Sequence, residues 1–171
     1  MTLLNWSHHE TAALESRTAF RRKATQQECN TIAAALEVLS CSCLEASYKI
    51  IPLARKRYRV HGSFRCSLQQ TSVISLEPIN FELNEVFDVE FWPESQLQDT
   101  IEVELDDPNR EDPEPIVAGQ LEVGRLIYEL IASQLDPYPR KDGETFELVT
   151  EQKDVPQGNS AFAKLAALKK T

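Results

Sequence analysis

Apolar and polar residues alternate through the middle of the chain with the two-residue period of a β-strand. In RYRVHGSFRCSLQ, residues 57–69, every second residue from Tyr58 to Leu68 is apolar or glycine, and polar or charged residues fill the positions between. The stretch NFELNEVFDVEFW, residues 80–92, alternates in the same way except at Glu85, which interrupts the apolar side. Each stretch predicts a half-buried antiparallel strand with one polar face. Glu85 predicts a bulge or a sheet edge.

The short segment LEPIN, residues 76–80, predicts a hairpin between these two strands. The arginines of the first strand would then lie beside the acids of the second, and each cross-strand pair would contribute roughly 0.2–1 kcal/mol. We expect the hairpin to be held by apolar residues alone, among them Ile74, Ile79 and Phe81. Weaker patterns predict further strands at 3–6, 11–22, 41–51 and 101–105, with a turn at 52–56.

Two stretches have the 3.6-residue period of a helix instead. The first spans 26–38, where Thr25 and Glu28 have the spacing of a capping box at the N-terminus. Its core-facing stripe is predicted to be Ile32, Leu36 and Leu39. The second spans 123–135, and its wide apolar stripe ends before Pro137, which cannot continue a helix. That stripe consists of Val123, Leu126, Ile127, Leu130, Ile131 and Leu135.

These elements predict an α+β fold, a curled antiparallel sheet or partly closed barrel covered by two to three helices. At 171 residues the chain has the length of one domain. We place that domain at 1–150, with an acidic, proline-rich loop at about 106–120. Residues 151–171 are predicted to form a flexible linker and a short basic amphipathic segment. The apolar runs are far shorter than the ~20 residues that span a bilayer, and the first residues lack the basic start of a signal peptide.

Charge is distributed unevenly over the chain, whose net charge is −9. That total argues against a protein that simply coats nucleic acid. Residues 49–65 nevertheless carry six basic residues and no acid, whereas 99–122 carry nine acids and one arginine. We therefore expect a bipolar molecule with one basic ribbon on an acidic body. The candidate RNA contacts in the ribbon are Lys49, Arg55, Lys56, Arg57, Arg59 and Arg65.

The sequence offers little chemistry for catalysis or metal binding. His8 and His9 are adjacent and are predicted to be solvated, and no phosphate-binding loop or nucleophile motif is present. Cys41 and Cys43 are predicted to share one face of a strand, which is a weak metal signal, and Cys66 is predicted to lie in the core. The acids Asp106, Asp107 and Asp112 lie in a loop without a preorganised geometry. We predict no catalytic residue, no cofactor, no metal and no small-molecule substrate.

Four blocks, taken in order, resemble the YceD family of large ribosomal RNA subunit accumulation proteins. They are VHGSFRCSLQQTSVISLEPINFELNEVFDVEFWPE at 60–94, the acidic loop, LEVGRLIYELIASQLDPYPRK at 121–141, and NSAFAKLAALKK at 159–170. The resemblance covers roughly residues 55–171. It implies a bacterial or organellar protein that supports accumulation of 23S ribosomal RNA, and it carries over no catalytic residue.

This chain departs from the family pattern at Ser72 and Ser75, where many members have Cys-x-x-Cys. Serine is a poor zinc ligand beside a thiolate, so a metal role in the family does not transfer to this chain. Ser160 also departs, because relatives tend to have proline there.

We therefore expect a cytoplasmic bacterial protein that assists large-subunit assembly without catalysis and without a membrane. Two mechanisms remain open. In one, the basic ribbon binds the backbone of ribosomal RNA. In the other, the chain is an acidic adaptor for a basic large-subunit ribosomal protein and does not contact RNA. The candidate residues for that second partner are Glu102, Glu104, Asp106, Asp107, Glu111, Asp112 and Glu114.

Overall fold

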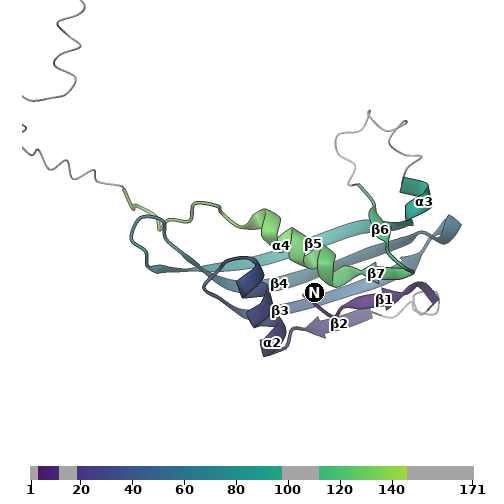
Figure 1. Cartoon of the computed structure of the whole chain (residues 1–171), viewed down its shortest axis with the longest axis horizontal. Helices are drawn as coiled ribbons and strands as arrows, with labels where there is room; N and C mark the ends of the chain where they lie inside the picture. The colour runs from purple at the N-terminus through teal and green to yellow at the C-terminus, as the bar shows by residue number, and fades with distance from the viewer. Residues whose placement is uncertain (1–3, 12–18, 98–111, 146–171) are drawn as a thin grey trace, which may run out of the picture.

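The computed structural model describes residues 4–11, 19–97 and 112–145 (Figure 1). These residues form a mixed α+β fold whose centre is a five-stranded sheet with the strand order β2–β3–β4–β5–β6. Its strands are β2 (Ala19–Lys23), β3 (Ser40–Pro52), β4 (Tyr58–Thr71), β5 (Pro78–Pro93) and β6 (Glu114–Ile116). A second sheet pairs β1 (Ser7–His9) with β7 (Gln120–Glu122). The described strands do not close into a barrel.

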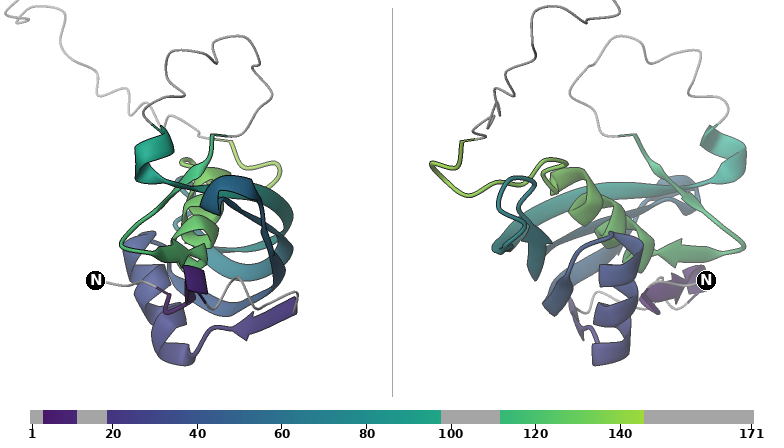
Figure 2. Two further views of the ribbon diagram at one scale, coloured as in Figure 1. Left: turned by 90° about the vertical axis from the view of Figure 1, so that its right-hand side faces the viewer. Right: turned by 60° about the vertical axis from the view of Figure 1, so that its left-hand side comes forward.

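The helices lie on the concave side of the five-stranded sheet, which curves around them (Figure 2). α2 (Gln26–Ala35) and α4 (Val123–Gln134) cover this inner face, while the single turn α3 (Glu94–Leu97) follows β5. A short 3-10 turn, η1 (Ala54–Lys56), joins β3 to β4. No described helix has the length and apolar character needed to cross a membrane.

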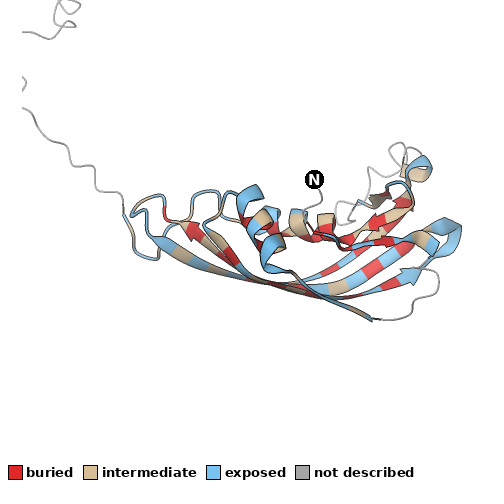
Figure 3. Ribbon diagram, turned by 60° about the horizontal axis from the view of Figure 1, so that its bottom comes forward, coloured by how far each residue is buried: buried red, intermediate tan, exposed pale blue. Residues whose placement is uncertain are grey.

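The long hairpin of β4 and β5 confirms the predicted alternation. Buried and exposed residues alternate along both strands (Figure 3). The pairing runs without a break from Tyr58 opposite Phe91 to Thr71 opposite Pro78. Of the two predictions for Glu85, the bulge is wrong, since Glu85 pairs in register with Phe64. The sheet edge is confirmed, because among the described strands β6 pairs with β5 only at 91–93 and leaves β5 at the edge beside Glu85.

The bulge of this sheet lies in β3 instead, between Cys41 and Cys43. Cys41 pairs with Leu68 and Cys43 with Ser67, which are consecutive residues of β4 and therefore point to opposite faces. Cys41 is buried and Cys43 is only half-buried. The prediction that these two thiols share a face is wrong, because the extra residue in the bulge changes the alternation of β3.

The core fills the space between the inner face and the helices. Tyr48, Tyr58 and Phe91 are its largest fully buried side chains, and Cys66 is buried beside them as predicted. Gly62 makes room for Tyr48, because a Cβ atom on Gly62 would lie 2.4 Å from both the Tyr48 Cβ and the Ser47 carbonyl oxygen. A side chain at position 62 would therefore displace the core.

Both helices form where the sequence predicts them. The capping box of α2 is present, because Thr25 and Glu28 bond reciprocally across the first turn. The helix ends at Ala35, and Glu37 then adopts a positive φ of 55°. The chain therefore leaves the helix early, and Leu39 is 54% exposed rather than in the core as predicted. In α4 the predicted stripe is confirmed by buried Val123, Leu126, Ile127 and Ile131, with Leu130 and Leu135 packed at its border.

The end of the β4–β5 hairpin is fastened to the segment after α4. Ser72 is fully buried, and its hydroxyl donates to Glu144 Oε2 at 2.6 Å and accepts from the Ile74 and Ser75 amides at 3.1 and 3.2 Å. The Val73 amide donates to the Pro139 carbonyl at 2.8 Å. We call this set of polar contacts the hairpin clasp. It corrects the prediction that apolar residues alone hold this turn.

Short elements account for the remaining differences from prediction. Part of the predicted acidic loop at 106–120 is strand, because β6 pairs in parallel with β5 and β7 pairs with β1. Leu4 and Trp6 are buried, but the described residues of the strand predicted at 3–6 are not strand, and β1 begins only after them at Ser7. The predicted strand at 101–105 and the segment 151–171 lie outside the described residues.

Candidate nucleic-acid interface

The outer face of the five-stranded sheet, which turns away from α2 and α4, gathers basic side chains from separate strands. Strand pairing aligns Arg21 with Ser47, and Lys23 with Glu45, across β2 and β3. It then aligns Glu45 with Arg65, and Lys49 with His61, across β3 and β4. All the cations of this face are exposed. We define the outer basic patch as Arg21, Lys23, Lys49, Arg59 and Arg65.

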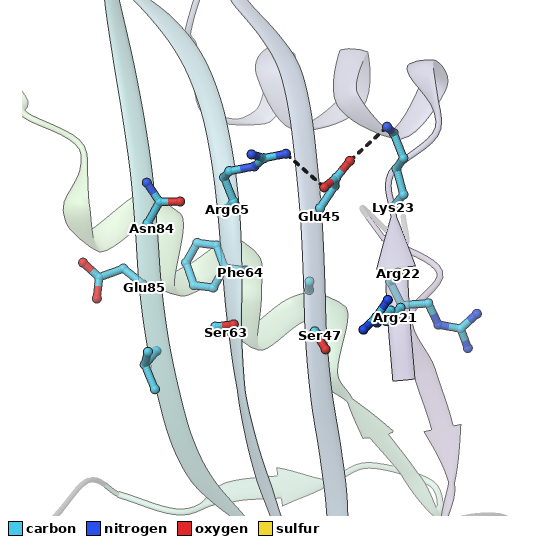
Figure 4. A pocket seen from close by; sticks show the side chains of 12 residues that line it. Arg21, Arg22, Lys23, Glu45, Ser47, Ser63, Phe64, Arg65, Asn84 and Glu85 are labelled. Atoms are coloured by element: carbon cyan, nitrogen blue, oxygen red, sulfur yellow. Dashed lines mark hydrogen bonds and ion pairs between the residues drawn. The ribbon is translucent and has the colours of Figure 1, made fainter. Parts of the chain in front are cut away.

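A shallow depression of about 600 Å³ lies within this patch (Figure 4). Arg21, Lys23 and Arg65 contribute to its lining, and Ser47 and Ser63 lie side by side across β3 and β4. A neighbouring hollow of about 330 Å³ shares these two serines and adds Lys49 and His61 to its lining. We call Ser47 and Ser63 the serine floor, because they belong to both hollows and place exposed hydroxyls among the cations.

Glu45 orders one end of the patch by bridging two cations. Its carboxylate lies 2.9 Å from Lys23 Nζ and 3.1 Å from Arg65 Nη2 (Figure 4). The hydrogen bond from Lys23 lowers the pKa of Glu45, and the same contact raises the pKa of Lys23. The three groups therefore stay charged near neutral pH, and together they leave one positive charge at this end.

Arg21 and Lys49 are the cations most available to a ligand. Both are exposed, and within the described part of the chain neither forms an ion pair. Arg59, in contrast, reaches Asp88 at 3.5 Å and Glu90 at 3.1 Å on β5. The predicted cross-strand pairing is thus confirmed at Arg59. The patch is least neutralised on the side of β2 and β3.

The other predicted RNA contacts lie at or near the β3–β4 turn. Arg57 stacks on the Trp92 ring, with its guanidinium carbon 3.3 Å from the ring centroid, and its Nε donates to Gln96 at 2.8 Å. Arg55 and Lys56 form the tip of the turn, and both have a positive φ, 61° and 58°. We call Arg55 and Lys56 the β3–β4 tip. The structure thus places Lys49, Arg59 and Arg65 on the sheet face and the remaining candidates beyond its end.

The acidic candidates are not gathered in the same way. Asp112 is exposed, but Glu114 forms an ion pair with Arg125 at 2.6 Å and is half-buried. Desolvation raises the pKa of Glu114 despite that partner. The remaining members, Glu102, Glu104, Asp106, Asp107 and Glu111, lie outside the described residues. Glu114 therefore contributes to the fold rather than to a free acidic surface.

The sequence analysis missed Arg21 and Lys23. They belong to the basic run Arg21-Arg22-Lys23, which was visible in the sequence as a cluster of charge. Its place on the outer face depends on the pairing of β2 with β3, which local periodicity does not reveal.

His8, predicted to be solvated, is buried and structural instead. Its Nε2 lies 2.8 Å from the Tyr48 hydroxyl. Burial, together with the charge of Arg22, lowers the pKa of His8 to about 4. The imidazole is therefore neutral near pH 7, and it serves to pack β1 against the sheet.

Cys29, Cys41 and Cys66 are buried on the opposite, inner side. Burial raises the pKa of Cys29 to about 11, and the neighbouring Cys66 thiol together with burial raises that of Cys41. The Cys29 and Cys41 thiols are therefore protonated near neutral pH and are poor metal ligands in that state. Within residues 4–11, 19–97 and 112–145, no group of three or more histidine, cysteine or acidic side chains is placed to hold a metal ion.

We compared the chain with family models, with curated proteins and with solved structures, and none of them matched.

Proposed function

We propose that this protein is a non-catalytic RNA-binding protein that supports the accumulation of large-subunit ribosomal RNA. The observation that carries the proposal is the outer basic patch, where five cations from three strands gather on a face that the described helices leave uncovered, four of them in the lining of the two hollows at the serine floor. The ribosomal target comes from the resemblance to the YceD family. It applies to this chain only as part of the proposal.

The chemistry of the patch suits a polyphosphate backbone. Guanidinium and ammonium groups bind phosphate oxygens, and exposed hydroxyls donate to them as well. The chain as a whole carries a charge of −9, so RNA would be repelled from most of the body and attracted to this face. The acidic-adaptor mechanism has less support, because Glu114 is already paired with Arg125.

Fluorescence anisotropy with fragments of 23S ribosomal RNA over a salt series tests the proposal. We expect affinity to fall steeply with salt, because phosphate contacts release counterions. The double variant Arg21→Gln, Lys49→Gln should bind RNA about tenfold more weakly and should reduce the salt slope by about 2. Arg21 and Lys49 form no described ion pair, so the fold should be unaffected.

Arg140→Glu is the matched control, because it changes the net charge by the same amount at an exposed site beyond α4. It should bind RNA within about twofold of the unmodified chain, since net charge alone acts weakly at a distance in salt. Equal losses in both variants, or no binding of any RNA at low salt, would refute the proposed role of the patch.

A further inference from the structure

Among the described residues, the outer face offers cations and hydroxyls, and its one exposed aromatic ring is that of His61, which lies 3.6 Å from the Asp88 carboxylate. The aromatic residues of the long strands, such as Tyr48, Phe64 and Phe87, point inward and are buried. At the exposed positions of these strands, the described residues are charged, polar or aliphatic, as at Lys49, Ser63 and Val86. Single-stranded RNA gains much of its affinity from bases that stack on aromatic side chains. This face cannot supply that contribution.

The cations are instead held at fixed separations by the sheet. Arg59 and Arg65 lie six residues apart on β4, which corresponds to roughly 20 Å along the strand. Arg21 and Arg65 lie on strands separated by β3, or roughly 10 Å across the sheet. A rigid pattern of charge suits a ligand whose phosphates are themselves at fixed positions. A double helix has that property, whereas a flexible strand must be ordered on binding.

The serine floor adds a feature that fits ribose. Ser47 and Ser63 are exposed and lie opposite each other, with Lys49 on one side of them along the strands, Arg65 on the other side, and Arg21 beside Ser47 on β2. The wide, shallow minor groove of A-form RNA displays its 2′-hydroxyls, and proteins that bind duplex RNA contact these together with the flanking phosphates. Hydroxyl side chains between two groups of cations can both donate to and accept from a 2′-hydroxyl.

We infer that the ligand of the outer face is double-helical RNA, bound through its phosphates and 2′-hydroxyls without reading of the bases. This inference rests on the proposed function and specifies its substrate class. Arg59 and Arg65 contact phosphates at the two ends of the face, and Arg21 and Lys49 contact phosphates beside the serine floor. The β3–β4 tip extends the line of cations beyond the sheet.

Three ligands of one sequence and length test the inference by anisotropy at constant salt: a 20-base-pair RNA duplex, one of its strands chosen to be unstructured, and the DNA duplex. We expect the RNA duplex to bind at least tenfold more tightly than the single strand and severalfold more tightly than the DNA duplex. A second RNA duplex of unrelated sequence should bind within twofold of the first.

The variant Ser47→Ala, Ser63→Ala should bring RNA and DNA duplexes to similar affinity while leaving the melting temperature unchanged. A single strand that binds as tightly as the duplex would overturn the inference, as would equal affinity of the unmodified protein for RNA and DNA duplexes. Either result would leave the proposed function intact. The proposed function fails separately, if no RNA binds or if Arg21→Gln, Lys49→Gln has no effect.

Discussion

The β4–β5 turn and the β3–β4 turn lie at the two ends of the sheet and join similar strands, but they differ in how they are stabilised. At the β4–β5 end, buried Ser72 fastens the turn to Glu144, and Val73 bonds to Pro139. At the β3–β4 end, the tip consists of two exposed basic residues, Arg55 and Lys56, both with a positive φ. One turn is closed by polar bonds to a distant segment, while the other presents charge to solvent.

The difference separates an end that is bonded to the rest of the fold from an end that is available for the RNA binding that we propose. The tip lies in a turn in which the Arg57 amide donates to the Ala54 carbonyl, and its two central residues have positive φ. Turns with positive φ at both central positions favour Asn and Gly there, and bulky residues are strained. Arg55 and Lys56 adopt this conformation although they gain no described salt bridge from it. The strain is understandable if the charge of the tip is needed for a ligand. The β4–β5 turn has one such residue, Leu76 with a φ of 60°, but there the backbone bonds within the turn and Ser72 satisfies three polar groups at once.

The largest expected effect comes from opening the clasp with Ser72→Ala. The Ile74 and Ser75 amides then lose their acceptor and Glu144 loses a donor, so the free energy of unfolding should fall by about 2 kcal/mol. Urea unfolding measures this loss. Ser95→Ala, at an exposed position of α3 that makes no described side-chain hydrogen bond, should change it by no more than about 0.5 kcal/mol. RNA affinity should be the same in both variants, and a drop in affinity with Ser72→Ala would contradict the separation of the two ends.

The next largest predicted effect is a gain in stability instead of a loss. Replacing the tip by Arg55→Asn, Lys56→Gly provides the residues that this turn conformation favours, and should raise the free energy of unfolding by about 1–2 kcal/mol. The same variant should bind RNA severalfold more weakly, because two phosphate contacts are lost. Weaker binding by a more stable protein cannot be attributed to unfolding.

Arg55→Gln, Lys56→Gln is the control for this pair of effects. It removes the same charges and keeps the strained backbone, so RNA affinity should fall equally while stability stays near that of the unmodified chain. If both variants bind RNA normally, the tip is not part of the binding end.

The smallest predicted effect concerns the way in which the melting temperature depends on pH through the hairpin clasp. The hydrogen bond from Ser72, and others from Ser75 and the Lys141 amide, lower the pKa of Glu144 below its ordinary value of 4.5. A carboxyl group whose pKa is depressed on folding stabilises the fold above that ordinary value, and the stabilisation is lost as the pH falls through the folded pKa. The melting temperature should therefore drop less steeply with acid in Glu144→Gln than in the unmodified chain, and an identical pH profile would exclude the contact in solution.

Local periodicity predicts those parts of the fold that depend on residues close in sequence. The alternation from Tyr58 to Leu68 sets the faces of β4, and the apolar stripe of α4 sets the side it buries. The bulge between Cys41 and Cys43 escapes prediction because one extra residue leaves the composition of a strand unchanged. Glu144 lies 72 residues from Ser72, so no local pattern connects them.

For the same reason, only part of the candidate site could be predicted from the sequence. Arg59 and Arg65 belong to the predicted hairpin, and Lys49 belongs to the weaker strand predicted at 41–51. The outward direction of all three follows from the alternation of their strands. Arg21 and Lys23 join them only because β2 pairs with β3. The three-residue strands β6 and β7 likewise depend on partners far along the chain.

Gly62 has a place in the sheet that affects both faces, and this place limits which mutations the chain can accept as it evolves. It lies between His61 and Ser63 of the outer face, while its own missing side chain leaves space for Tyr48 on the inner face. A methyl group at position 62 would meet the Ser47 carbonyl oxygen and the Cα and Cβ atoms of Tyr48, which a smaller side chain at position 48 would not remove. Among descendants of this chain, glycine should therefore be inherited at position 62 whatever residue occupies position 48, and a lineage that loses it should lose the shape of the outer face together with its core.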